Sequence, residues 1–573
     1  MTSGPDEPVI IIVGGDALAL GTAQELCVLQ GHHVLVLWRR DPDFARAVET
    51  VGAVFIAGQP DTPETLARAG VASAITILAL SGDDQLNLHA ALLARDANPG
   101  IRVVLRQFNR RLARKIEQNL PDCSVVSLAW HSAATYAAAA LDAYCFRGLQ
   151  FPEPEGPLTG FTTRIAENCG VAEFTVAEAE KALSARIVAV EGETTVARDA
   201  IIAPHAELAV YGDLSKLQRS APSTPVVRTR ATIGRRLRSL RQGQRLRSPR
   251  LNPILVRLAL AAFAVFAAGL AYFRTVFGDT WLDAAYFVIA TMTTTGYGDI
   301  TPNRHDKIEI IAAMLLMLSG TALTGLFIAF GASLLTRVQW VTLQGLRPVH
   351  RRGHIIVCGA GSIGSGVIEL LLALGKRLVV IEQTPDTAIV ELAQERRFDL
   401  LTGDASRDET LDLCNIGAAH SIIALTNVDT LNLEIGLGAR ARNPTMPAVL
   451  RIAEPSFAAS IARHFEFQTT FSVAALAAPV FVGLSRFAGS RGRVAIAGRE
   501  FGLGEYTIGE DGLPNPPSDA ILLAASRDGD FALLGDFRAL EPGHRVLIMV
   551  PMAPFRDGKY TLAAAAERFL QGR

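Results

Sequence analysis

The chain has 573 residues, which is more than a single hydrophobic core accommodates and predicts three to five structural units. Charged residues make up 19% of the sequence and the formal net charge is −1, so nucleic acid is not expected as a partner. The six cysteines form no CxxC pair and have no histidine beside them at metal-ligand spacing, which argues against a disulfide scaffold and a zinc site.

The N-terminal part of the chain follows a βαβ pattern. An apolar run at Val9–Val13 leads into a Gly-rich turn, an amphipathic helix and a second apolar run at His33–Trp38. Short apolar strands then alternate with helical stretches, as in a parallel sheet covered by helices. We expect a Rossmann-like N-lobe over residues 1–140 and a small α+β C-lobe over residues 141–217. The polar start MTSGPDEP does not fit a signal peptide, so this region is expected to stay in the cytosol.

A basic linker, residues 218–250, contains nine arginines between Arg228 and Arg250. A solvated linker and an amphipathic helix lying on anionic lipid both explain this composition. The apolar segment that follows, Ile254–Phe273, has 20 residues and would form a helix of about 30 Å, long enough to cross a bilayer. We therefore expect a first transmembrane helix within residues 251–274.

The next region, residues 275–307, holds an apolar run at Ala284–Met292 that is too short to cross a membrane and is interpreted as a re-entrant pore helix. It leads into TMTTTGYGDITP, which resembles the selectivity filter of potassium channels. Glycines permit backbone dihedrals that aim carbonyl oxygens at an ion, where they replace its hydration shell. The resemblance assigns the filter to Thr294, Thr295, Gly296, Tyr297, Gly298 and Asp299, with Thr295 where valine or isoleucine is commoner.

A second apolar segment, Ile310–Leu335, carries no charged side chain and predicts a transmembrane helix within residues 308–337. Gly320 or Gly325 could serve as a gating hinge in this helix, or as a position of close helix packing. Arginines flank both spans, and by the positive-inside rule both termini then face the cytoplasm. We expect a multi-pass protein of the bacterial inner (plasma) membrane.

The C-terminal part repeats the N-terminal part after a linker at residues 338–352. Ile11–Gly21 aligns without gaps on Ile355–Ser365, an offset of 344 residues, and further matches follow near an offset of 345. We expect a second N-lobe at residues 353–480 and a second C-lobe at residues 481–573. The predicted fold class is thus two α/β Rossmann-like domains, each with a small α+β lobe, flanking an all-α two-helix pore module with a re-entrant loop.

The second copy carries the residues of a dinucleotide-binding turn. Gly359, Gly361 and Gly364 follow a strand and open a helix, where backbone N–H groups can hold a phosphate. Glu382 ends the next strand, where it can accept hydrogen bonds from ribose hydroxyls. We expect nucleotide binding in the second copy and not in the first, where the alignment places Gly15, Ala17 and Leu20 at the glycine positions and Trp38 at the acid.

Both copies resemble the RCK (regulator of potassium conductance) domains of bacterial ligand-gated potassium channels and transporters. The resemblance implies a homotetramer in membrane lipid that passes K⁺ and is gated by an adenine nucleotide, NAD(H) or ATP/ADP. It also implies that no metal site of the calcium-gated members is present. By position in the family, the residues bordering the nucleotide would include Asp404, Thr426, Asn427 and Arg451.

Two alternatives to a potassium-selective channel are open. Thr295 in the filter is compatible with a weakly selective cation channel or a regulatory subunit. A membrane-anchored NAD-dependent oxidoreductase would use the glycine turn but leave the filter without a role. No His-Asp or Ser-His group stands beside that turn, so we expect no catalytic residue and no enzyme.

Overall fold

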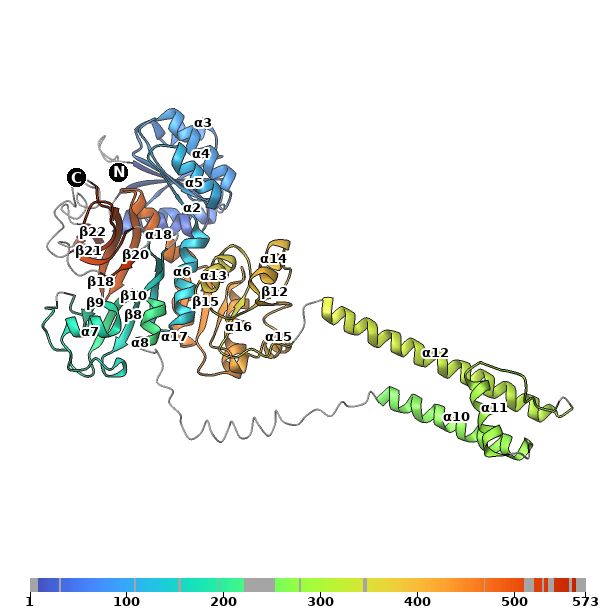
Figure 1. Ribbon diagram of the computed structural model, residues 1–573. Coiled ribbons are helices and arrows are strands. Elements are labelled where there is room, and N and C mark those ends of the chain that lie inside the picture. Colours follow the sequence, from blue (N-terminus) through green and yellow to red (C-terminus); the bar gives the residue numbers. More distant parts are fainter. Residues whose placement is uncertain are drawn as a thin grey trace. The chain divides into compact units, whose positions relative to one another are not determined.

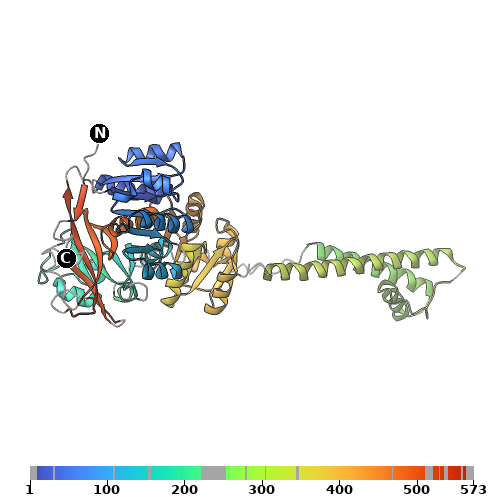
Figure 2. The ribbon, with the colours of Figure 1, turned by 90° about the horizontal axis from the view of Figure 1, so that it is seen from above.

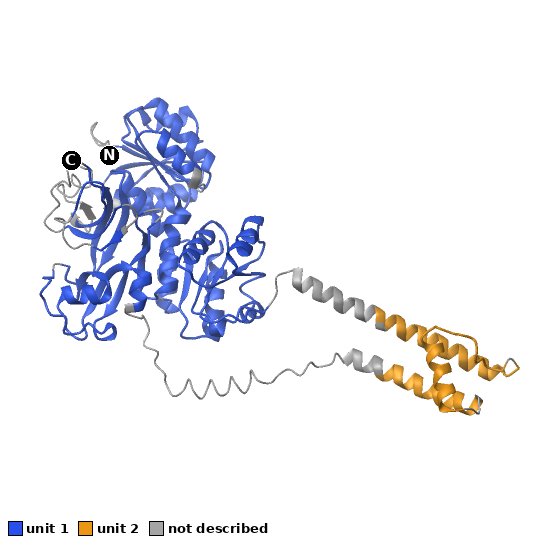
Figure 3. Ribbon diagram, viewed as in Figure 1, with its two compact units in different colours: residues 1–225, 347–573 blue, residues 226–346 orange. Residues whose placement is uncertain are grey.

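The computed structural model of the chain forms two compact units (Figure 3). One unit comprises residues 1–225 and 347–573, and the other comprises residues 226–346. The described residues are 9–29, 32–107, 110–152, 156–194, 196–220, 253–277, 280–303, 305–343, 348–467, 469–509, 520–527, 530–533, 540–555 and 559–562.

The first N-lobe is a six-stranded parallel sheet with the order β3-β2-β1-β4-β5-β6 (Figure 1). Alternate residues of β1 enter two different hydrophobic clusters, so both faces of the sheet are buried. The strands are β1 (Val9–Val13), β2 (His33–Trp38), β3 (Val54–Ala57), β4 (Thr76–Ala79), β5 (Arg102–Arg106) and β6 (Cys123–Val126). The helices are α1 (Ala17–Gln24), α2 (Pro42–Thr50), α3 (Pro63–Arg68), α4 (Asp84–Ala97), α5 (Arg110–Asn119) and α6 (Leu128–Leu141).

The second N-lobe repeats this topology with the order β13-β12-β11-β14-β15-β16. The strands are β11 (Ile355–Cys358), β12 (Leu378–Glu382), β13 (Asp399–Thr402), β14 (Ser421–Ala424), β15 (Ala448–Ile452) and β16 (Thr470–Ser472). The helices are α13 (Ser362–Ala373), α14 (Thr387–Arg396), α15 (Asp408–Leu413), α16 (Asp429–Arg442), α17 (Pro455–His464) and α18 (Val473–Leu484). In both sheets the strand order reverses beside the first strand of the copy, which is where such sheets bind ligands.

Each C-lobe is an antiparallel sheet. The first contains β7 (Cys145–Gln150), β8 (Leu158–Ile165), β9 (Ala185–Val190) and β10 (Glu207–Asp213), in the order β7-β8-β10-β9, with α7 (Val176–Leu183) and α8 (Leu214–Ser220). The second contains β17 (Ser490–Ile496), β18 (Arg499–Thr507), β19 (Ile521–Arg527), β20 (Asp530–Ala532), β21 (Arg545–Phe555) and β22 (Lys559–Leu562), in the order β17-β18-β21-β19-β20 with β22 on β21. The predicted fold class is confirmed.

The strand registers correct the gapless alignment of the two glycine turns by one residue. Ile10 pairs with Thr76 and Ile355 pairs with Ser421, so the first strands are related by an offset of 345. One extra residue in the first copy therefore lies further along, where α1 continues as a π-helical turn at Glu25–Leu29 that absorbs it. The residues at the positions of Gly359, Gly361 and Gly364 are Gly14, Asp16 and Ala19, and not Gly15, Ala17 and Leu20.

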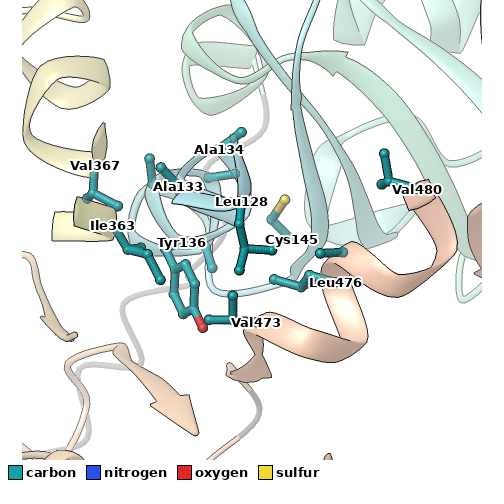
Figure 4. Packing of buried hydrophobic residues seen from close by; sticks show 14 of the residues in the cluster. Leu128, Ala133, Ala134, Tyr136, Cys145, Ile363, Val367, Val473, Leu476 and Val480 are labelled. Atoms are coloured by element: carbon teal, nitrogen blue, oxygen red, sulfur yellow. The ribbon is translucent and has the colours of Figure 1, made fainter. Parts of the chain in front are cut away.

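The two copies exchange helices within their unit, and Figure 2 shows their lobes gathered around shared helices. Helix α6 packs on α13 and α18, and α1 packs on α18. A Cβ atom on Gly366 would lie 3.1 Å from Ala133 Cβ, and Tyr136 Oη donates a hydrogen bond to the Phe471 carbonyl at 3.0 Å. Figure 4 shows this joint, with Leu128, Ala133 and Tyr136 of α6 between Ile363 and Val367 of α13 and Val473 and Leu476 of α18.

The other unit consists of three helices, α10 (Pro253–Phe277), α11 (Trp281–Met292) and α12 (Lys307–Leu343). Phe273 and Phe287 pack with a ring separation of 4.7 Å, and Val288 is fully buried beside them. Among the described residues, Lys307–Leu326 within α12 is long and apolar enough to cross a membrane. Helix α12 also extends through Leu343, so the first residues of the expected 338–352 linker are helical.

Candidate functional site

The backbone of the glycine turn in the second N-lobe requires glycine at two of its positions. Gly359 has a φ of +97°, in the left-handed region that favours glycine. A Cβ atom on Gly364 would lie only 2.0 Å from the Gly359 carbonyl oxygen, so this position also requires glycine. Gly361 is the N-cap residue of α13, and no side chain at this position accepts a hydrogen bond from the helix. A Cβ atom added to Gly361 would have no other atom within 4 Å. The first N–H groups of α13 therefore have no side-chain cap and can donate to an anion.

Glu382 and Asp404 lie at the carboxyl ends of β12 and β13, next to this turn. Glu382 accepts hydrogen bonds from the N–H groups of Ala360 at 2.7 Å and Thr384 at 3.2 Å, so it also fixes the turn. Each carboxylate oxygen has a second lone pair that a ribose hydroxyl can use. Asp404 accepts from the backbone N–H and hydroxyl of Ser406, and these bonds lower the pKa of Asp404 and keep it ionised.

Thr426, Asn427 and Arg451 lie at the ends of β14 and β15. The Arg451 guanidinium donates to Asn427 Oδ1 at 2.8 Å and to two backbone carbonyls at 3.4 Å. These acceptors are neutral, so the charge of Arg451 suits an anionic ligand. Apart from Gly361 and Gly364, which begin α13, the predicted nucleotide-binding residues therefore lie at or just after the carboxyl ends of neighbouring strands. This is the edge at which open α/β sheets bind ligands.

Sequence reasoning missed Asn432, a buried residue of α16 that holds this edge together. Its side chain accepts from the Thr426 N–H at 2.9 Å and donates to the carbonyls of Thr426 and Arg451. Asn87 makes the same three contacts with Ser81 and Arg106 in the first copy. The tripeptide LNL occurs at both positions, and this repeat could have drawn attention to the two asparagines.

The first copy fills the equivalent positions with its own side chains. The indole of Trp38 covers the turn so closely that a Cβ atom on Gly15 would lie 1.9 Å from its Nε1. Asp16, at the position of Gly361, caps α1 by accepting from the Ala19 N–H at 3.1 Å and also accepts from Arg106 at 2.6 Å. A carboxylate of the chain thus occupies the helix N-terminus where a phosphate would bind, which explains the expected lack of binding better than the misaligned Leu20 does.

The filter segment, residues 294–299, follows α11 directly. Thr294, Gly296 and Gly298 have φ of +61°, +54° and +73°, so every second residue is left-handed. The N–H groups of Thr295 and Gly296 donate to the Ala290 carbonyl at 2.9 and 3.1 Å. Such alternation turns successive carbonyl groups toward one side, as an ion-coordinating backbone requires.

Tyr286 of α11, which sequence reasoning did not single out, holds the outer end of the segment. Its hydroxyl donates to Asp299 Oδ2 at 2.8 Å, and its ring stacks on that of Tyr297 with a separation of 6.3 Å. Tyr286 therefore contacts two filter residues, Tyr297 and Asp299, through its side chain. The sequence feature that could have identified Tyr286 is its place as an aromatic residue near the start of the apolar run Ala284–Met292.

Gly320 and Gly325 have different surroundings in α12. A Cβ atom on Gly320 would lie 2.5 Å from Met292 Cα, so this glycine lets α12 approach the end of α11. No atom lies within 4 Å of the corresponding position on Gly325. The helix is continuous through both residues, and the contact favours close packing over a hinge at Gly320.

Comparison with known proteins identifies the domains. Residues 10–126 and 355–472 match the TrkA-N domain family, and residues 260–337 match the ion channel family. Neither match points to a catalytic family. The solved structure titled "Crystal Structure of the GsuK RCK domain" has a TM-score of 0.50 and 14% identity, covering 96% of this chain and 93% of that one. The "GsuK channel bound to NAD" has the same TM-score and identity and covers 100% of this chain and 80% of that one.

Curated relatives agree with these domains. The chain is 26% identical over 181 residues to the voltage-gated potassium channel Kch of Escherichia coli, covering 31% of this chain and 43% of Kch. It is 28% identical over 190 residues to potassium channel protein 1 of Methanocaldococcus jannaschii, covering 32% of this chain and 56% of that protein. The chain thus spans about half the length of these two relatives. With a TrkA-N domain on each side of one ion-channel domain, the chain is homologous to the prokaryotic potassium channels that carry RCK domains.

Proposed function

We propose that the chain is one subunit of a homotetrameric potassium-selective channel, gated by an adenine nucleotide at the second N-lobe. The observation that carries the proposal is the alternating left-handed backbone at Thr294, Gly296 and Gly298, directly after α11 and inside the ion-channel domain. One such segment supplies one wall of an ion pathway, and four related by symmetry would surround an ion. Four subunits would also bring eight TrkA-N domains together.

The membrane topology belongs to the same proposal. Helices α10 and α12 would span the bilayer of a bacterial inner membrane, α11 would re-enter it, and both termini would lie in the cytoplasm. The arginines between Arg228 and Arg250 and those after α12 support this orientation, since positive charge stays on the cytoplasmic side.

The regulatory ligand is proposed from the edge of the second sheet. The open N-terminus of α13 suits a phosphate, Glu382 suits a ribose and Arg451 suits a further negative charge. A structural neighbour is described as bound to NAD, and NAD(H), ATP and ADP are the nucleotides we propose to test.

Potassium flux into liposomes containing the purified chain, measured with each nucleotide in turn, tests both parts of this proposal. At least one nucleotide should change the flux in the parent. Glu382→Ala should weaken that response, whereas Trp38→Ala should preserve it because Trp38 lies in the first copy. A response that survives in Glu382→Ala but is lost in Trp38→Ala would place the nucleotide in the first copy and contradict the proposal.

A further inference from the structure

A cavity of about 240 Å³ lies within the unit formed by residues 1–225 and 347–573, and no residue of either glycine turn lines it. One wall is the edge of the first N-lobe, formed by α5, β6 and the start of α6. The opposite wall is formed by α18 and the start of β17 from the second copy. A ligand in this cavity would therefore touch both copies of the domain.

The walls of the cavity carry excess positive charge. The guanidinium groups of Arg114 and Arg491 belong to residues that line it. Glu117 also lines it, with Oε1 accepting from the Val125 N–H at 2.7 Å. Arg491 pairs with Glu505 at 2.5 Å, and the same carboxylate also pairs with Arg545. Guanidinium groups thus outnumber carboxylates around the cavity.

A further guanidinium lies directly behind the cavity wall without a counter-charge. Arg147 is only 5% exposed and donates to His131 Nε2 at 3.0 Å and to the carbonyls of Leu476 and Arg491. Its Nε has no hydrogen-bond partner, and among the described residues no carboxylate forms an ion pair with it. A buried charge of this kind is costly unless an anion lies nearby.

His131 connects this buried charge to the cavity that it lines. Because its Nε2 accepts from Arg147, a neutral ring carries its proton on Nδ1, which is then a donor. Burial and the neighbouring Arg147 and Arg491 lower the pKa of His131, which keeps the ring neutral. Ser127 and Ser490 add hydroxyl groups to the same walls.

We propose that this cavity is a binding site for a phosphate group, held between the N-lobe of the first copy and α18 and β17 of the second copy. The donors that line it are the guanidinium groups of Arg114 and Arg491, the His131 ring and the two hydroxyls, which together suit an oxyanion. Trp130 and Leu484 supply an apolar wall, which leaves room for the carbon skeleton of a phosphorylated metabolite. The site is distinct from the proposed nucleotide site and does not depend on it.

Calorimetric titration of the full chain with inorganic phosphate and, separately, with ribose 5-phosphate tests this site. Binding of either probe should weaken about tenfold in Arg114→Gln, because one charge-assisted hydrogen bond is lost. Glu117→Gln keeps the acceptor for Val125 but removes a negative charge, so it should strengthen binding. Lys115→Gln is the matched control, since Lys115 neighbours Arg114 on α5 but does not line the cavity, and it should bind as the parent does.

Gly361→Asp separates this cavity from the second glycine turn. It places a carboxylate at the α13 N-terminus in open space and should leave binding to the cavity unchanged. Tighter binding of ribose 5-phosphate than of phosphate would identify an organic phosphate as the ligand, and the reverse would identify the free anion. Absence of binding by both probes, equal effects of Arg114→Gln and Lys115→Gln, or loss of binding in Gly361→Asp alone would overturn the proposal.

Discussion

Single residues distinguish the two glycine turns, and we propose that they decide which copy can hold a nucleotide. Gly361 leaves the start of α13 open, whereas Asp16 at the same position of the first copy caps α1 and pairs with Arg106. Trp38 covers the turn where the second copy has Glu382. The same fold thus leaves the helix N-terminus without a side-chain cap in the second copy and caps it with a carboxylate in the first.

Gly361→Asp should convert the second copy to the state of the first. The new carboxylate would cap α13 and repel a phosphate, so nucleotide affinity should fall at least tenfold while the domain stays folded. Gly417→Asp makes the same change at another glycine with open space around it and should bind nucleotide as the parent does. Calorimetry on the full-length proteins measures both, and an unchanged affinity in Gly361→Asp would argue against phosphate binding at α13.

We expect Glu25, at the contact between the two copies, to make the stability of the fold depend on pH. It pairs with Arg493 at 2.6 Å, yet burial outweighs this guanidinium and raises the pKa of Glu25 to about 7. The folded state then holds a proton that the unfolded state releases near pH 4.5. Stability should therefore fall as the pH rises from about 4.5 to about 7, by up to about 3 kcal/mol.

Glu25→Gln keeps a hydrogen-bond acceptor for Arg493 and removes this titration. Melting temperatures of variant and parent, compared at pH 5, 6, 7 and 8, should diverge in favour of the variant as the pH rises. A difference that stays constant or reverses would mean that the ion pair, and not burial, controls Glu25. Because both proteins share all other titratable groups, the difference between their melting temperatures reports on Glu25 alone.

At the scale of elements, helices join parts of the chain that are distant in sequence. Helix α6 of the first copy packs on α13 and α18 of the second, so the two N-lobes and C-lobes form one unit. In the other unit, α11 packs between α10 and α12 and presents the filter segment at its end.

Close approach of α12 to α11 depends on Gly320. Gly320→Ala should disrupt this contact, since the added Cβ would lie 2.5 Å from Met292 Cα and shift the backbone that leads into the filter. Gly325→Ala is its matched control in the same helix and should preserve ion flux. If Gly325→Ala instead abolished ligand-dependent flux while Gly320→Ala behaved as the parent does, a hinge at Gly325 would be the better explanation.

The sequence predicted the strand and helix types and the repeat, because apolar β-branched runs and glycine turns are local signals. It misplaced the first glycine turn by one residue, since the gapless match hid an insertion that the π-helical turn at Glu25–Leu29 absorbs. It could not show that Trp38 covers its own turn or that Asn432 bridges two strand ends. Those contacts join residues far apart in the chain, and periodicity carries no information about them.

At the scale of the whole molecule, the proposed ion conduction and the proposed ligand sensing belong to separate units of the chain. The ion pathway is proposed from α11, the filter segment and α12, and the sensing unit from two TrkA-N domains that share helices. Because α6, α13 and α18 pack together, a ligand in either copy has a contiguous route to the other. Ligand binding changes the pore only through different affinities for the open and closed states.

Potassium selectivity is tested most directly by the reversal potential of the purified chain in a bilayer, with potassium on one side and sodium on the other. We expect a reversal potential close to the potassium equilibrium potential and loss of the current in Gly298→Ala, because Gly298 has φ +73°. A reversal potential near zero, or an unchanged current in Gly298→Ala, would contradict a potassium-selective filter at residues 294–299.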